Sequence, residues 1–154
     1  MSELAWRDVN AAELDAATVY DVLALRSAVF VVEQDCAYQD VDGRDLLPGT
    51  RHVLGEDSEG LAAYARILAP DLEHHVPRIG RVIVAPRARG RQLGRELVQH
   101  ALDACAERWP GDPVELGAQA HLSGFYGGFG FVAQGAPYDE DGIPHVWMRR
   151  EPGR

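Results

Sequence analysis

One stretch, residues 79–97, places the strongest constraint on how this chain can fold. It begins with a β-branched run, Val82-Ile83-Val84, continues through an arginine-rich segment that contains Gly90, and ends in an apolar helical pattern that starts at Leu93. The pattern predicts a strand, a turn and a helix start. A helix N-terminus presents unpaired backbone N–H groups at the positive end of the helix dipole, where phosphate binds readily. We therefore expect a main-chain anion site surrounded by Arg87, Arg89, Arg91 and Arg95.

The charge distribution supports a small anionic ligand. The net charge is -9, yet the segment from Arg78 to Arg95 contains only basic charges, all of them arginine. Binding to nucleic acid normally requires a basic face, which the acidic remainder of the chain does not favour. A positive island on a negative body is expected where a small anion binds.

The length of 154 residues predicts one domain, residues 1–154. No apolar run approaches the roughly 20 residues of a membrane span, and the first residues do not resemble a signal peptide. We therefore expect a cytoplasmic protein that does not bind a membrane. The two cysteines, Cys36 and Cys105, have no partners at disulfide or zinc spacing, so no metal is expected.

The order of the expected elements predicts a mixed α/β sheet. A capping box of Asn10 and Glu13 should start the first helix, which ends near Glu33. An acidic segment follows, and its turn residues predict solvated turns. The last two strands should pair across an Asp141-Gly142 turn. The expected elements are strand 4–7, helix 10–33, hairpin 51–55 and 61–68, strand 82–84, a helix from 93 to the Pro110-Gly111 break, strand 113–117, helix 122–129, and strands 131–133 and 145–149.

Two motifs resemble those of the GNAT family of acyl-CoA-dependent N-acetyltransferases. The first is Val84-x-Pro86-x-x-Arg89-Gly90-x-x-x-Gly94, which is similar to the acetyl-CoA motif of that family. The second is Phe125-Tyr126-x-x-Phe129-Gly130-Phe131, preceded by Gln119. The resemblance implies a single-domain GNAT fold, with a mixed twisted central sheet of about six to seven strands flanked by helices.

The chain resembles the ElaA-like subfamily more closely than it resembles the family as a whole. The resemblance extends over nearly the whole chain and rests on four segments: Leu25-Arg26-x-x-Val29-Phe30-Val31-Val32-Glu33-Gln34, Arg66-Ile67, Gly80-Arg81-Val82 and Leu116-Gly117-Ala118-Gln119-Ala120-His121. One position departs from the family motif, because Gln92 stands where glycine is usual. The side chain there must point away from the pyrophosphate or donate its amide to it, and the backbone contacts can survive if the φ of Gln92 is negative.

The resemblance implies acetyl-CoA as co-substrate and direct acetyl transfer to a primary amine of a small molecule or peptide. Pantetheine would pair with the main chain of Val82, Ile83 and Val84. The implied pyrophosphate and coenzyme A contacts are Arg87, Arg89, Gly90, Arg91, Gln92, Leu93, Gly94, Arg95, Gln119 and Tyr126.

By motif position, Tyr126 is the proton donor to the coenzyme A sulfur. The base stays open among Glu33, His121, His52 and Glu115, and ordered water is a further possibility. The amine is expected to enter between segments 35–45 and 138–142, whose seven carboxylates either attract a cationic amine or only solubilise the loops. Whether the protein forms a homodimer also stays open.

Three alternatives remain. Cys36 could carry the acyl group in a ping-pong reaction. Arg26-x-x-Val29-Phe30 and the acidic loop are also similar to acyl-homoserine-lactone synthases. From a different class, the chain could be a non-catalytic acyl-CoA-binding regulatory module.

Overall fold

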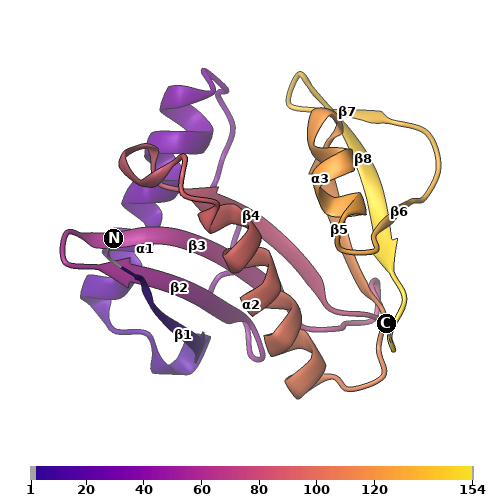
Figure 1. Cartoon of the computed structure of the whole chain (residues 1–154), viewed down its shortest axis with the longest axis horizontal. Helices are drawn as coiled ribbons and strands as arrows, with labels where there is room; N and C mark the ends of the chain where they lie inside the picture. The colour runs from indigo at the N-terminus through magenta and orange to yellow at the C-terminus, as the bar shows by residue number, and fades with distance from the viewer. Residues whose placement is uncertain (1–2, 154) are drawn as a thin grey trace.

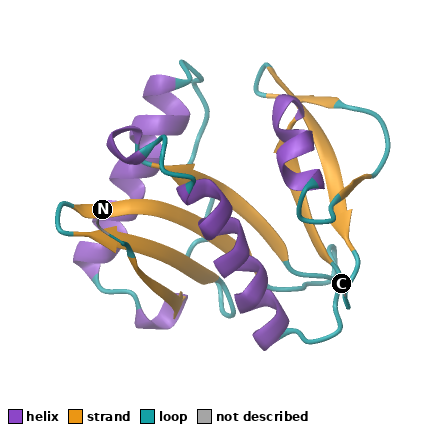
Figure 2. Ribbon diagram, viewed as in Figure 1, coloured by secondary structure: helices purple, strands orange, loops and turns teal. Residues whose placement is uncertain are grey.

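A computed structural model describes residues 3–153, which form a mixed α/β sheet with helices on both faces (Figure 1). The expected fold class is confirmed, and the sheet has eight strands in the order β1-β2-β3-β4-β5-β8-β6, with β7 paired to β8. The strands are β1 (Ala5–Asn10), β2 (Arg51–Asp57), β3 (Gly60–Leu68), β4 (Arg78–Val84), β5 (Val114–Gln119), β6 (Val132–Ala133), β7 (Tyr138–Glu140) and β8 (Ile143–Arg150). Figure 2 shows the helices and strands in the same view.

Three α-helices flank the sheet: α1 (Ala16–Arg26), α2 (Leu93–Arg108) and α3 (Ser123–Gly127). The apolar side of α2 packs against one face, and its buried residues include Leu97, Val98 and Ala101. On the other face, Val22 of α1 packs with Leu54, Tyr64 and Ile83. The helical period of the sequence therefore correctly predicted which side of α2 faces the core.

The start of the first helix differs from the prediction. The capping box of Asn10 and Glu13 is present, but it caps a short 3-10 helix, Ala11–Glu13. Leu14 is extended and interrupts the helix, and Asp15 then caps α1 by accepting a hydrogen bond from the N–H of Thr18 at 2.8 Å. A π-helical segment, Ser27–Glu33, continues α1 to the expected end.

The last strands also differ in their connection. Val132–Ala133 does pair with β8, opposite Arg149 and Met148. The Asp141-Gly142 turn, however, joins β8 to a strand that the sequence did not predict, β7. The short segment Tyr138–Glu140 has every side chain exposed, so it carries no apolar alternation from which a strand could be recognised.

The two halves of the sheet separate between β4 and β5. These parallel strands pair only through Arg78 and Glu115, near the start of each strand, and then diverge (Figure 1). Short 3-10 helices, Pro86–Ala88 and Ala120–Leu122, follow the diverging ends. No helix within residues 3–153 is long and apolar enough to cross a membrane.

Candidate active site

A cavity of about 710 Å³ occupies the opening between β4 and β5. Val82, Ile83 and Val84 line one wall, and Ala118 and Gln119 line the other. The predicted pantetheine strand therefore borders the opening. Parallel strands that diverge leave main-chain groups along their facing edges without sheet partners, and these groups are available to an extended ligand.

A β-bulge interrupts β4 beside this cavity. Gly80 pairs with Arg66 and Ile83 with Tyr64, so two residues of β4 face the single Ala65 of β3. One of the two, Arg81, has a φ of 53°, in the left-handed region that side chains disfavour. Strain of this kind persists only where the surrounding structure holds it, and bulges commonly occur next to active sites.

The loop before α2 has the expected open main chain. Gly90 has a φ of 85°, and the N–H groups of Gly90 and Gln92 donate no hydrogen bond to a protein carbonyl within residues 3–153. The condition of a negative φ is not met at Gln92, which has a φ of 58° and directly precedes α2. Its side chain is exposed and makes no capping bond, so glutamine takes a left-handed conformation here, as glycine would.

Gly94 lies in the first turn of α2, close to the strand that ends in Val84. A Cβ atom added to Gly94 would lie 3.8 Å from the Phe125 ring and 3.9 Å from Cγ2 of Val84. These are ordinary van der Waals distances, so the position accepts a small side chain but leaves little room for a larger one.

Two of the four loop arginines are held by carboxylates from distant parts of the chain. Arg87 donates two hydrogen bonds to Asp57, at 2.9 and 3.0 Å. Arg89 binds both carboxylate oxygens of Glu33. The segment lacks acids in the sequence, but the fold supplies them, and hydrogen bonding from Arg87 lowers the pKa of Asp57 to about 2. Arg95 is exposed and makes no ion pair in the described part of the chain, so it is available to a phosphate.

Tyr126 reaches the cavity from α3. Its side chain is 6% exposed, and its ring packs edge-on against Phe125 and Phe131. The hydroxyl makes no hydrogen bond to another residue between positions 3 and 153. Burial raises the pKa of Tyr126 to about 12, so the hydroxyl keeps its proton at neutral pH and can donate it.

The four candidate bases lie in different environments. Glu33 lines the cavity, but hydrogen bonding from Arg89 lowers its pKa and occupies both oxygens. His121 also lines the cavity, is exposed, and forms no hydrogen bond to the residues that the structure describes.

His52 and Glu115 do not line the cavity. The two ring nitrogens of His52 lie 2.6 Å from the Tyr64 hydroxyl and 2.9 Å from the Asp45 carbonyl. Glu115 accepts hydrogen bonds from Trp147 and Arg149. Both side chains are thus held by hydrogen bonds within the folded protein.

Gln119 connects the two sides of the opening. Its Nε2 atom donates a hydrogen bond to Oε1 of Gln34, which follows the π-helical segment, at 3.3 Å. Both glutamines line the cavity.

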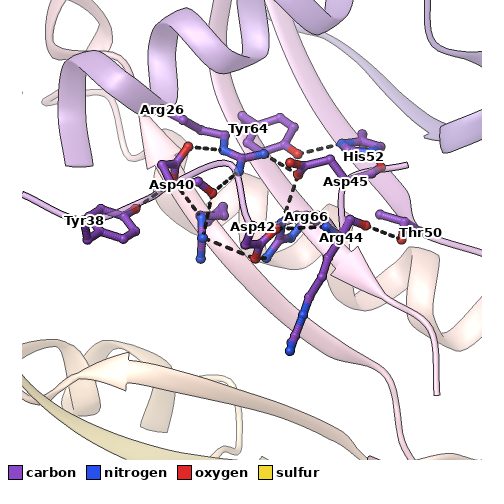
Figure 3. A network of polar contacts seen from close by, with 11 residues as sticks. Arg26, Tyr38, Asp40, Asp42, Arg44, Asp45, Thr50, His52, Tyr64 and Arg66 are labelled. Atoms are coloured by element: carbon purple, nitrogen blue, oxygen red, sulfur yellow. Dashed lines mark hydrogen bonds and ion pairs between the residues drawn. The ribbon is translucent and has the colours of Figure 1, made fainter. Parts of the chain in front are cut away.

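The acidic segment after the first helix is anchored and not, as predicted, a set of solvated turns (Figure 3). Arg26 is fully buried and donates to Asp40 at 2.8 Å. Arg66 donates to Asp42 at 2.8 Å and to Asp45 at 2.9 Å.

Arg81, at the β-bulge, donates to Asp40 at 2.8 Å. Three arginines therefore neutralise three of the seven carboxylates for which attraction of a cationic amine was one of the two options. All three arginines belong to the ElaA-like sequence segments, which was the available signal for this network.

Sequence reasoning treated His145 only as the start of a strand, but His145 also lines the cavity. It pairs with Gln119 across β5 and β8 and is 8% exposed. Its Nδ1 atom lies 2.8 Å from the Ile143 carbonyl, and Nε2 lies 3.6 Å from Glu140. No local sequence pattern distinguishes a cavity histidine from any other strand residue.

Comparisons with known proteins agree with this geometry. The Acetyltransferase (GNAT) domain family matches residues 17–152. Protein ElaA of Escherichia coli is 50% identical over 95% of each chain, and its crystal structure superposes with a TM-score of 0.91 over 96% of this chain and 99% of that one. An acyl-CoA N-acyltransferase of Pseudomonas aeruginosa is 46% identical, with a TM-score of 0.92 over 96% of this chain and 99% of that chain.

The acyl-homoserine lactone synthase BjaI is also similar, with a TM-score of 0.75 over 98% of this chain and 84% of that chain. At 16% identity it shares only the fold. The matches at high identity and coverage, together with the cavity beside the bulged strand, establish the family. The chain belongs to the GNAT family of acyl-CoA-dependent N-acyltransferases.

Proposed function

We propose that this enzyme transfers an acetyl group from acetyl-CoA directly to a primary amine of a small molecule or peptide. The observation that carries the proposal is the Tyr126 hydroxyl, which has no partner among residues 3–153 and lines the same cavity as the bulged strand. A buried tyrosine that keeps its proton is suited to protonate a thiolate as it leaves.

The residues around the opening fit coenzyme A. The edge of Val82–Val84 would pair with the pantetheine amides, and the N–H groups from Gly90 to Arg95 would receive the pyrophosphate at the N-terminus of α2. Arg95 and, more weakly, Arg91 would add charge, because Arg87 and Arg89 already hold carboxylates.

The reaction begins when the lone pair of a neutral amine attacks the thioester carbonyl carbon. A C–N bond forms, the C–S bond breaks, and the sulfur takes the proton of Tyr126. A main-chain N–H beside the bulge at Arg81 would stabilise the oxyanion, an effect typically worth about 3 kcal/mol.

The amine must lose a proton, and we propose His121 as its acceptor, directly or through water. This assignment follows from the cavity position of His121 and from its imidazole, which forms no hydrogen bond to residues 3–153. Glu33 is a weaker candidate because Arg89 lowers its pKa. His145 is a second histidine on the wall, and comparison of His121→Gln with His145→Gln in pH–rate profiles separates the two.

A ping-pong reaction through Cys36 is the second candidate. Cys36 lines the cavity, and its Sγ donates to the Asp141 carbonyl at 3.3 Å. In that case, incubation with acetyl-CoA alone would add the mass of one acetyl group to the protein, and Cys36→Ala would prevent it.

Thiol release from acetyl-CoA over a panel of amines and peptides tests the proposal. We expect release with at least one acceptor, and a kcat for Tyr126→Phe that is lower by about 100-fold or more. Tyr20→Phe is the matched control, because Tyr20 is 76% exposed on α1. Tight binding of acetyl-CoA without release for any acceptor would instead support a regulatory module.

A further inference from the structure

The cavity extends to the face of the sheet that lies opposite α2. Ile79, Leu116 and Val146 belong to the core under α2. Because side chains alternate along a strand, their neighbours point to the other face. The neighbours that line the cavity there are Arg78, Gly80, Gly117, His145 and Trp147. Under the proposed function, coenzyme A binds at the N-terminus of α2. The acceptor therefore binds on this other side, away from the α2 face.

The charges on this side do not suit a polycation. Asp42 lines the cavity, but it binds Arg66 at 2.8 Å and Arg81 at 3.4 Å. Hydrogen bonding and charge from Arg66 keep the pKa of Asp42 well below its usual range. The negative charges of Asp42 and of the acidic segment around it are therefore already paired with arginines of the protein.

Arg44 is the available cation of this wall. Its backbone is fixed, because its N–H donates to Asp42 at 3.1 Å and its carbonyl accepts from Thr50 at 3.0 Å. Its side chain extends away from the polar network and lines the cavity (Figure 3). Within residues 3–153 the Arg44 guanidinium makes no hydrogen bond or ion pair.

Two further arginines lie on the same wall, but each is already paired with carboxylates. Arg66 and Arg78 line the cavity, and the Nε atom of each is buried without a hydrogen-bond partner. Arg78 forms an ion pair with Asp71 at 2.9 Å, and Arg66 forms ion pairs with Asp42 and Asp45. Among the arginines of this wall, Arg44 is therefore the one whose guanidinium has no carboxylate partner within residues 3–153.

The opposite wall of the cavity carries negative charge. The β7–β8 hairpin contributes Glu140 and Asp141 to the cavity, and Glu140 lies 3.6 Å from Nε2 of His145. An acceptor between the two walls therefore meets arginine on one side and carboxylate on the other. A molecule with an anionic group and an amine matches both.

We infer that the acceptor carries a carboxylate as well as its amine, as an amino acid or a short peptide does, and that Arg44 binds this carboxylate. The planar guanidinium donates two parallel hydrogen bonds to a carboxylate, which gives both affinity and orientation. The inference rests on the proposed function and names its class of acceptor.

Dipeptides with a free C-terminal carboxylate, compared with the same dipeptides as C-terminal amides and with spermidine, test the inference by thiol release. We expect the wild-type kcat/KM to be about tenfold higher for the free carboxylate. Arg44→Gln should raise KM for the carboxylate substrates by about the same factor and leave the amide substrates unchanged.

Arg108→Gln is the matched control, because Arg108 is exposed at the end of α2 and does not line the cavity. Equal or better use of amides or spermidine would overturn the inference while the proposed function stands. A preference that persists in Arg44→Gln would overturn the role of Arg44. Release with none of the amines would overturn both proposals.

Discussion

We predict that loss of the buried arginine at the centre of the polar network destabilises the folded protein. Arg26 is fully buried and binds the carboxylates of Asp40 and Asp45 and the carbonyl of Asp40. Replacement by methionine keeps much of the volume but removes the charge. Two aspartates then lose a partner, and the balance of three arginines against three aspartates is broken.

The cost follows from what each aspartate retains. Removal of one partner of a buried ion pair typically costs about 3–5 kcal/mol. Asp40 keeps its hydrogen bond from Arg81, and Asp45 keeps its bond from Arg66. We therefore expect the lower end of the range, about 3 kcal/mol, which lowers Tm by about 6–12 °C in a chain of this size.

Urea denaturation measures this loss as a lower midpoint with an unchanged m-value. Arg7→Met is the control, because Arg7 forms an exposed ion pair with Glu56 that is worth less than about 1 kcal/mol. The double variant Arg26→Met/Asp45→Asn should recover part of the loss. An Arg26→Met protein as stable as Arg7→Met would refute the reasoning.

Because the pKa of Tyr126 is about 12, kcat should show no tyrosine ionisation below about pH 10, and a decline with a pKa near 10 would contradict its burial. Gly90→Val should weaken acetyl-CoA binding in calorimetry more than Arg91→Ala, because Gly90 has a φ of 85°; the reverse ranking would mean that side chains dominate. The folded-state pKa values of Asp42, Asp45 and Asp57 are lowered, so their stabilisation is complete above about pH 4 and is lost as the pH falls through the folded values.

The last prediction is checked by urea denaturation between about pH 5 and pH 2.5. The free energy of unfolding should fall steadily with pH, and the fall should be shallower in Asp57→Asn. A free energy that stays level over this range would show that these carboxylates are not stabilised in the folded protein.

Local signals predicted those elements whose cause is local. The β-branched run at Val82–Val84 and the helical period from Leu93 correctly gave β4 and α2, because alternation and helical spacing depend only on near neighbours. The Asn10 capping box shows the limit of such signals. It formed as predicted, but the extended Leu14 behind it made α1 begin only at Ala16, with Asp15 as its cap.

In the candidate site, too, some residues are identified by sequence motifs and others only by the fold. Tyr126 and Arg89 were found from motifs, and the structure brings both to one cavity with His121. Sequence could not distinguish His121 from His52, because only the fold buries His52 between Tyr64 and Asp45. The β-bulge at Arg81 was likewise beyond prediction, since it depends on the register between two strands.

The sequence by itself determined the family, the strand, loop and helix around Gly90, and the short helix that carries Tyr126, since these depend on residue type and short spacing. Only the tertiary structure decided which charges are free. Arg87 binds Asp57, 30 residues away, and Arg89 binds Glu33, 56 residues away, whereas Arg44 is left available. Ion pairing depends on distance in space, which residues far apart in the chain acquire only when the sheet and its loops have formed.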